Sequence, residues 1–103
     1  EGGGADVVTS MSVLNVIPEQ ASRFNHIELV HNVVRPGGRA IFKVWAGLWP
    51  ERGTGTPQYD SAQDSFQANA WASAFLPEVE SVFGKGNAYA DNNLNLILAI
   101  RQP

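Results

Sequence analysis

The chain has 103 residues, of which 44% are hydrophobic and 17% charged, with a formal net charge of -3 and no cysteine. This length allows one small domain, 1–103, and the apolar residues gather in discrete runs that exclude a disordered chain. The seven Lys and Arg residues are scattered, so we expect no nucleic-acid partner. The lack of cysteine excludes disulfides and thiolate metal sites.

Neither membrane insertion nor secretion is expected. No apolar run approaches the roughly 20 residues that a membrane helix needs, and Glu1 to Asp6 are acidic and glycine-rich. We therefore predict a cytoplasmic protein, which the absence of cysteine fits. A domain this small buries a modest share of its surface, so a partner chain that covers apolar surface is plausible.

The first element expected is a strand over residues 6–12. Its β-branched and apolar residues do not alternate strictly with polar ones, which is typical of a strand covered on both faces in a parallel sheet. A helix is expected over 18–33, because Pro18 and Glu19 suit a first turn. Its apolar stripe recurs at helical spacing and comprises Phe24, Ile27, Val30 and Val34.

Pro36, Gly37 and Gly38 should end that helix, since proline disfavours helical backbone before it. A second strand is expected over 39–46. Strand, helix and strand make a βαβ unit, whose two strands run parallel.

Residues 47–65 have no apolar period and are expected to form one long loop. A helix is predicted over 69–83, with Asn69 as its N-cap. We expect Pro77 to kink it or split it in two. An antiparallel hairpin is expected over 87–101, because Asp and Asn favour tight turns.

In this order the elements resemble the C-terminal half of a class I S-adenosylmethionine-dependent methyltransferase. Asp6 to Leu14, followed by Pro18, looks like the family's fourth strand and its exit. Val34 to Arg39 is similar to the turn into the fifth strand, usually written LKPGG. Gln67 to Phe83 and the last two strands resemble the closing helix and the antiparallel sixth and seventh strands. The resemblance implies an α/β fold: a three-layer, Rossmann-like half-domain of parallel strands with a C-terminal antiparallel hairpin.

The resemblance also implies a site at the carboxyl ends of the strands, where open α/β sheets bind ligands. Cofactor contacts are expected from Ser10, Met11 and Ser12. Substrate contacts are expected from Asn15, Trp45, Trp49 and Tyr59. Asn15 and Val16 stand where many relatives carry an acidic residue and a histidine, so no histidine base is expected there and the catalytic residues are unknown.

The family holds S-adenosylmethionine mainly through a glycine-rich turn and an acidic residue, and neither has a counterpart here. Gly2, Gly3 and Gly4 precede a strand instead of following one. The resemblance therefore implies methyl transfer to an unknown acceptor of the small-molecule class, and only if a partner or a missing N-terminal half completes the site. This chain alone should be inactive. The alternative is a non-catalytic half-domain that acts as a binding or oligomerisation module. A split sheet leaves an unpaired edge, so the partner expected is a second copy of the chain, in a homodimer that covers this edge, or a missing N-terminal half.

Plainer interpretations stay open for several residues. Met11 can be a flexible core filler, and the aromatic residues around the loop can plug a small core or cover an edge. His26 and His31 are five residues apart on a helix, with no partner at metal-ligand spacing, so surface positions and no metal site are expected. A nucleophilic triad could be assembled from Ser10 or Ser12, Asp6 and either histidine, yet no G-x-S-x-G motif is present to expose a serine.

Overall fold

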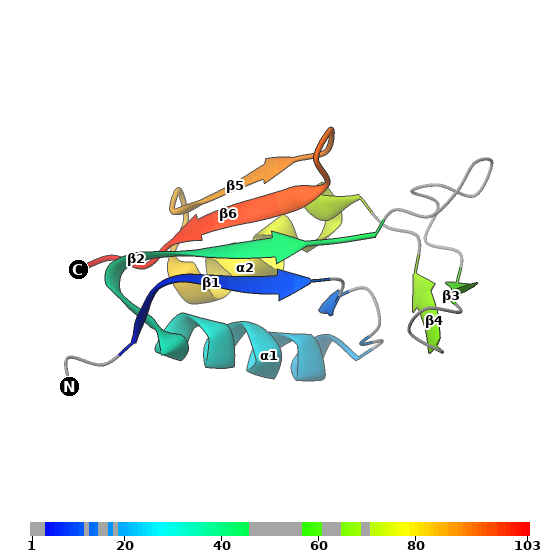
Figure 1. The fold of residues 1–103 in the computed structure, drawn as a ribbon, viewed down its shortest axis with the longest axis horizontal. Helices are drawn as coiled ribbons and strands as arrows, with labels where there is room; N and C mark the ends of the chain where they lie inside the picture. Colours follow the sequence, from blue (N-terminus) through cyan, green and yellow to red (C-terminus); the bar gives the residue numbers. More distant parts are fainter. Residues whose placement is uncertain are drawn as a thin grey trace.

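The computed structural model describes residues 4–11, 13–14, 17, 19–45, 57–60, 65–68 and 71–103, with the backbone alone for 57–60 and 65–68. Its elements are shown in Figure 1. In chain order they are β1 (Ala5–Met11), α1 (Gln20–Val33), β2 (Val34–Lys43), β3 (Pro57–Asp60), β4 (Ser65–Ala68), the 3-10 helix η2 (Ala72–Phe75), α2 (Leu76–Phe83), β5 (Ala88–Asp91) and β6 (Leu96–Ile100).

The main sheet is mixed and has the strand order β1-β2-β6-β5. β1 and β2 are parallel, with Ser10 opposite Phe42, which confirms the parallel pair that the sequence predicts. β6 lies antiparallel to β2 on one side and to β5 on the other. The strand that follows β2 in space is thus the last strand of the chain.

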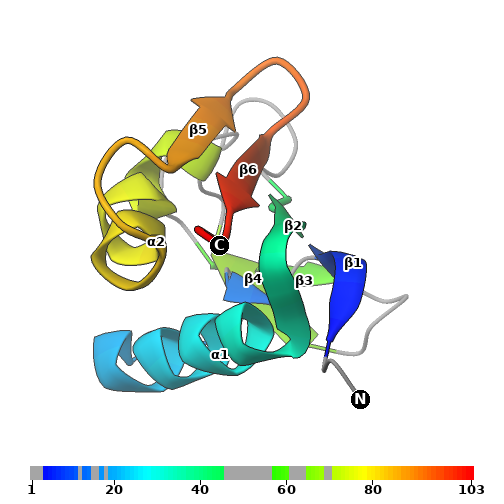
Figure 2. The same cartoon turned by 90° about the vertical axis from the view of Figure 1, so that its left-hand side faces the viewer.

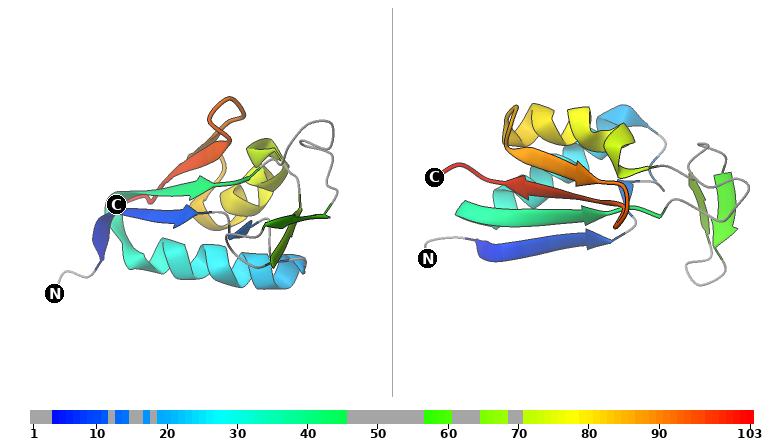
Figure 3. Two further views of the ribbon diagram at one scale, coloured as in Figure 1. Left: turned by 45° about the vertical axis from the view of Figure 1, so that its right-hand side comes forward. Right: turned by 90° about the horizontal axis from the view of Figure 1, so that it is seen from above.

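Both helices pack on one face of this sheet, as the view along the strands shows (Figure 2). α1 packs against β1 and β2, and α2 packs beside α1 against β5 and β6. Figure 3 shows the same two layers from above. The described part of the chain therefore forms two layers, and no described helix supplies the expected third layer on the opposite face.

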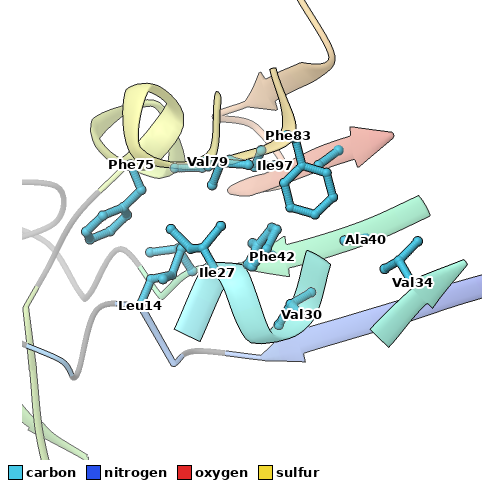
Figure 4. Close-up of a cluster of buried hydrophobic side chains, with 13 residues drawn as sticks. Leu14, Ile27, Val30, Val34, Ala40, Phe42, Phe75, Val79, Phe83 and Ile97 are labelled. Atoms are coloured by element: carbon cyan, nitrogen blue, oxygen red, sulfur yellow. The ribbon is translucent and has the colours of Figure 1, made fainter. Parts of the chain in front are cut away.

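The core fills the space between the sheet and the two helices (Figure 4). Phe42 of β2 is fully buried, and its ring meets the ring of Phe83 of α2 edge to face at 6.1 Å. Full burial of a side chain of this kind stabilises a fold by roughly 1.5–3 kcal/mol. The other members of the core are Leu14, Ile27, Val30, Val34, Ala40, Val44, Ala72, Phe75, Val79, Ile97 and Ala99.

The opposite face of the sheet carries a grid of side chains that no described helix covers. We call it the open face. Cross-strand register places its members in three rows: Val7, Arg39 and Ile100; then Thr9, Ile41, Leu98 and Tyr89; then Met11, Lys43, Leu96 and Asp91. Met11 is 59% exposed and Tyr89 is 65% exposed. A largely apolar grid is therefore left facing solvent.

The second strand differs from its expected bounds of 39–46. β2 begins at Val34, directly after the helix, and ends at Lys43. Pro36, Gly37 and Gly38 lie inside it, at the point where its register with β1 shifts between Ala5 and Val7. The PGG segment thus bends a continuous strand, and Gly37 takes a positive φ of 85°, which glycine adopts without strain.

The helix expected over 69–83 begins later than predicted. Trp71 is extended, with φ -76° and ψ 148°, and the first helical residue is Ala72. A 3-10 turn then leads into α2, with Pro77 in its first turn. The predicted split at Pro77 is confirmed, but a start at Asn69 is wrong, because the first helical N–H finds its acceptor on Asn95, far along the chain.

The segment 47–65 is not one long loop. Residues 57–60 form β3, which pairs antiparallel with β4 over 65–68, and Figure 1 shows this pair beyond the carboxyl ends of β1 and β2. Near the C-terminus, Asp91 accepts hydrogen bonds from the N–H groups of Asn93 and Leu94 at 2.9 and 3.2 Å. That turn leads from β5 into β6.

Candidate functional site

Because β1 and β2 are parallel, their carboxyl ends meet at one edge of the sheet. Met11 ends β1 and lies opposite Lys43, which ends β2. Met11 projects into solvent, and the ammonium group of Lys43 donates a hydrogen bond to the carbonyl of Leu94. Trp45 follows two residues later and is half-buried. Of the predicted site residues, Met11 and Trp45 therefore lie at the carboxyl ends of these strands, and the structure adds Lys43 beside Met11.

Ser10 is the neighbour of Met11, but its side chain points the other way. It is only 5% exposed and lies on the helix side of the sheet, opposite buried Phe42. Its hydroxyl shares a hydrogen bond of 2.9 Å with Nε2 of His26, on α1. The hydroxyl expected to touch a cofactor instead ties the edge strand to the helix beneath it.

His26 has an environment that favours its neutral form. Burial lowers the pKa of its imidazole, because removing a cation from water is unfavourable. Its ring meets Phe42 edge to face at 6.5 Å. A neutral imidazole beside a serine hydroxyl is the pairing of a nucleophile and its base. Here it lies between the sheet and α1, and we infer a structural role.

The two histidines expected on the surface are partly covered by neighbouring phenylalanine rings. His26 and His31 are half-buried, and His31 packs edge to face on Phe83 at 4.9 Å. The inward face of α1 is rotated from the predicted stripe, because Phe24 is 38% exposed while Arg23 is partly buried. A polar residue on an inward helix face is not recognised from an apolar stripe, and this explains why the contact of His26 was missed.

Arg23 is held by a contact between the two helices. Its Nε and a terminal nitrogen donate to the two carboxylate oxygens of Glu78 at 2.8 and 2.9 Å, and its other terminal nitrogen donates to the carbonyl of Ile17 at 2.9 Å. The hydrogen bond to Glu78 raises the pKa of Arg23. The guanidinium also lies 5.5 Å from the centre of the Phe75 ring.

The side chains of four predicted site residues lie outside the described part of the chain. Ser12, Asn15 and Trp49 lie outside the described residues. Tyr59 lies in β3, where its backbone pairs with Phe66, but its side chain is outside what the structure describes. Conversely, Lys43 was not singled out from the sequence. The register of β1 against β2 would have been needed to bring it beside Met11.

A hollow of about 150 Å³ lies between the two helices. Its lining is Gln20, Phe24, Pro77, Glu78 and Ser81, and it contains none of the predicted site residues. Among the described residues no group of three histidine and acidic side chains could hold a metal ion. The parallel arrangement of β1 and β2 therefore identifies their carboxyl ends as the candidate site.

Comparisons of the sequence with known proteins assign the chain to no family. No family model matches the chain, and no curated protein matches it significantly. None of the described helices has the length and apolar character required to cross a membrane.

Proposed function

We propose that this chain is a methyltransferase-like half-domain that contributes to an S-adenosylmethionine site completed by a partner or a further segment. The observation that carries the proposal is the parallel pair β1 and β2, joined by α1, whose carboxyl ends bring Met11 and Lys43 together. The antiparallel strands β6 and β5 that follow also agree with the family's order of elements. A three-layer, Rossmann-like arrangement with a closing hairpin belongs to this proposal.

The residues at the edge suit cofactor binding only in part. Met11 offers an exposed, apolar thioether side chain, which can pack against a ligand. Ser10 is already bonded to His26, so we assign it the role of holding the end of β1 in place. Trp45 is half-buried just beyond β2 and is our candidate to border the acceptor. S-adenosylmethionine would supply the methyl group, and the acceptor is unknown.

Methyl transfer needs few catalytic side chains. It depends chiefly on holding the donor and the acceptor close and in line, which an edge of fixed strands can do. We therefore assign no catalytic base. Because the family's main cofactor motif has no counterpart here, we expect this chain alone to bind S-adenosylmethionine weakly and to catalyse no methyl transfer. We also propose a cytoplasmic location, on the absence of cysteine.

A nuclear magnetic resonance titration of the chain with S-adenosylmethionine tests the proposal. We expect saturable shifts of the amide signals of Met11 and Lys43, and of the indole of Trp45. Met11→Ala should weaken binding without changing the unfolding midpoint, whereas Leu29→Ala, which truncates an equally exposed residue of α1 (62%), should leave binding unchanged. Saturable shifts elsewhere only, or none, would contradict the proposal.

The second candidate is a non-catalytic half-domain that acts as a binding or oligomerisation module. The open face favours it, because Val7, Met11 and Tyr89 are each more than half exposed there, and contiguous exposed apolar surface marks interaction sites. A chain that binds no cofactor but self-associates would favour this candidate over the first. The oligomer that we propose for this candidate is a homodimer.

A further inference from the structure

The outer edge of β1 has no partner strand among the described residues. β1 ends the sheet on one side, since β2 is its only neighbour among the described strands, and it is seven residues long. β5, at the other end of the sheet, has only four residues. Figure 3 shows both edges from above. An edge strand presents unpaired backbone N–H and C=O groups, and short strands limit this hazard. β1 is thus the longer of the two edges.

The sequence of β1 does little to discourage pairing. Edge strands are commonly protected by lysine, proline or a bulge. Residues 7–11 contain no lysine or proline, and the register with β2 is regular from Val7 to Met11. The only charge in β1 is Asp6, which is paired with Arg35. Nothing in the central part of β1 therefore opposes the addition of a strand.

We propose that two copies of this chain pair through their β1 strands, antiparallel, about a twofold axis that passes through Thr9. The main sheets of the two copies would join into one. This inference rests on the homodimer proposed above and specifies its interface, and it does not depend on the proposed cofactor site.

The side chains of β1 explain why a second copy fits this edge. Val7 and Met11 lie two residues on either side of Thr9, on the open face, and are 53% and 59% exposed. In the register centred on Thr9, Val7 of each copy lies opposite Met11 of the other, and the two Thr9 side chains meet at the axis. Opposite residues of an antiparallel pair have Cβ atoms about 4.5–5.5 Å apart. Each exposed apolar group thus meets another, because the strand is complementary to itself.

The first test is sedimentation equilibrium of the whole chain across the micromolar range, where we expect a monomer–dimer equilibrium. Val7→Lys removes two symmetry-related apolar contacts and should raise the dissociation constant by about tenfold. Tyr89→Lys is the matched control, because it introduces the same charge at an exposed position of the same face, on β5. It should leave the constant unchanged. The double variant V7K/M11E should recover dimerisation, since it places opposite charges across the axis.

A second test fixes the register and does not depend on affinity. The chain has no cysteine, so Thr9→Cys introduces one thiol, and two copies paired as proposed bring these thiols within disulfide reach. Mild oxidation should give a covalent dimer of Thr9→Cys much faster than of Tyr89→Cys. A chain that stays monomeric at the highest soluble concentration would overturn the proposal. So would equal cross-linking of the two cysteine variants, or equal effects of Val7→Lys and Tyr89→Lys.

Discussion

Val44 and Asn95 are joined by two hydrogen bonds. The N–H of Val44 donates to the backbone carbonyl of Asn95 at 2.9 Å, and the side-chain amide of Asn95 donates to the carbonyl of Val44 at 2.6 Å. The side-chain oxygen of Asn95 also accepts from the N–H of Ala72 at 2.6 Å. Asn95 is 4% exposed and has a φ of 53°. One buried amide thus connects the end of β2, the turn before β6 and the start of the second helical segment.

Asn95→Ala should be among the most destabilising substitutions in this chain. It leaves the Val44 carbonyl and the Ala72 N–H without this partner, and each unsatisfied buried group costs roughly 1–3 kcal/mol. We expect a loss of about 2–4 kcal/mol in the free energy of unfolding in urea, a large share of the 5–15 kcal/mol typical of a domain. Asn95→Gly should lose nearly as much, since it retains the positive φ but not the side chain. A loss below about 0.5 kcal/mol for either variant would contradict this role.

Asn95 also shows why one boundary could not be predicted. Asn69 is a good capping residue by local rules, and the local pattern predicts a helix start there. The amide that accepts from the first helical N–H is instead 23 residues away. Local patterns predicted the existence and order of β1, α1, β2 and α2, but an acceptor from another part of the chain moved this boundary. β3 and β4 were missed for a related reason, because residues 57–60 and 65–68 acquire strand geometry only by pairing with each other.

The contact between Arg23 and Glu78 should contribute more to the free energy of unfolding than an ion pair on the surface does. Both side chains are nearly buried, with 16% and 15% exposed, and the paired groups form two parallel hydrogen bonds. Removing one partner of a buried pair costs roughly 3–5 kcal/mol, and of an exposed pair 0–1 kcal/mol. We expect Glu78→Gln to lose about 1–3 kcal/mol in a urea unfolding experiment, between these limits.

The ion pair of Arg35 with Asp6 is the matched control, because its side chains are 52% and 77% exposed. Asp6→Asn should change the unfolding free energy by less than about 0.5 kcal/mol. Equal losses for Glu78→Gln and Asp6→Asn would mean that burial does not set the strength of these pairs.

The buried position of His26 predicts acid sensitivity. Burial lowers the pKa of His26 in the folded chain. Below about pH 6.5, the ordinary pKa of histidine, the unfolded chain therefore binds a proton more readily than the folded chain. The contribution of neutral His26 to the stability of the fold is complete above that pH. It is lost as the pH falls toward the pKa of His26 in the folded chain. Unfolding midpoints should therefore fall as the pH drops below about 6.5, before most carboxyl groups titrate. His26→Gln should flatten the curve in this window, whereas His31→Gln, the matched control on the same helix, should retain it.

The candidate site was only partly predictable for a reason that Ser10 and Met11 illustrate. The βαβ pattern predicts that the ends of β1 and β2 share an edge. It does not predict which side chains point outward, since a strand without strict alternation gives no orientation. Only the register, with Ser10 opposite buried Phe42, turns the hydroxyl inward and Met11 outward. The inward position of Ser10 then explains its contact with His26.

The two glycines of the PGG segment should respond differently to substitution. A Cβ on Gly38 would lie 2.9 Å from the carbonyl oxygens of Arg35 and Asp6, so backbone must move, and Gly38→Ala should lose about 2–3 kcal/mol. Gly37 has open space around it but a φ of 85°, which asparagine tolerates better than other residues. Gly37→Asn should therefore lose less than about 1 kcal/mol, and Gly37→Ala about 1–2 kcal/mol. Urea unfolding of the three variants measures this order. A larger loss for Gly37→Asn than for Gly38→Ala would show that backbone conformation, and not the close approach of β1 and β2 at Gly38, is what the segment requires.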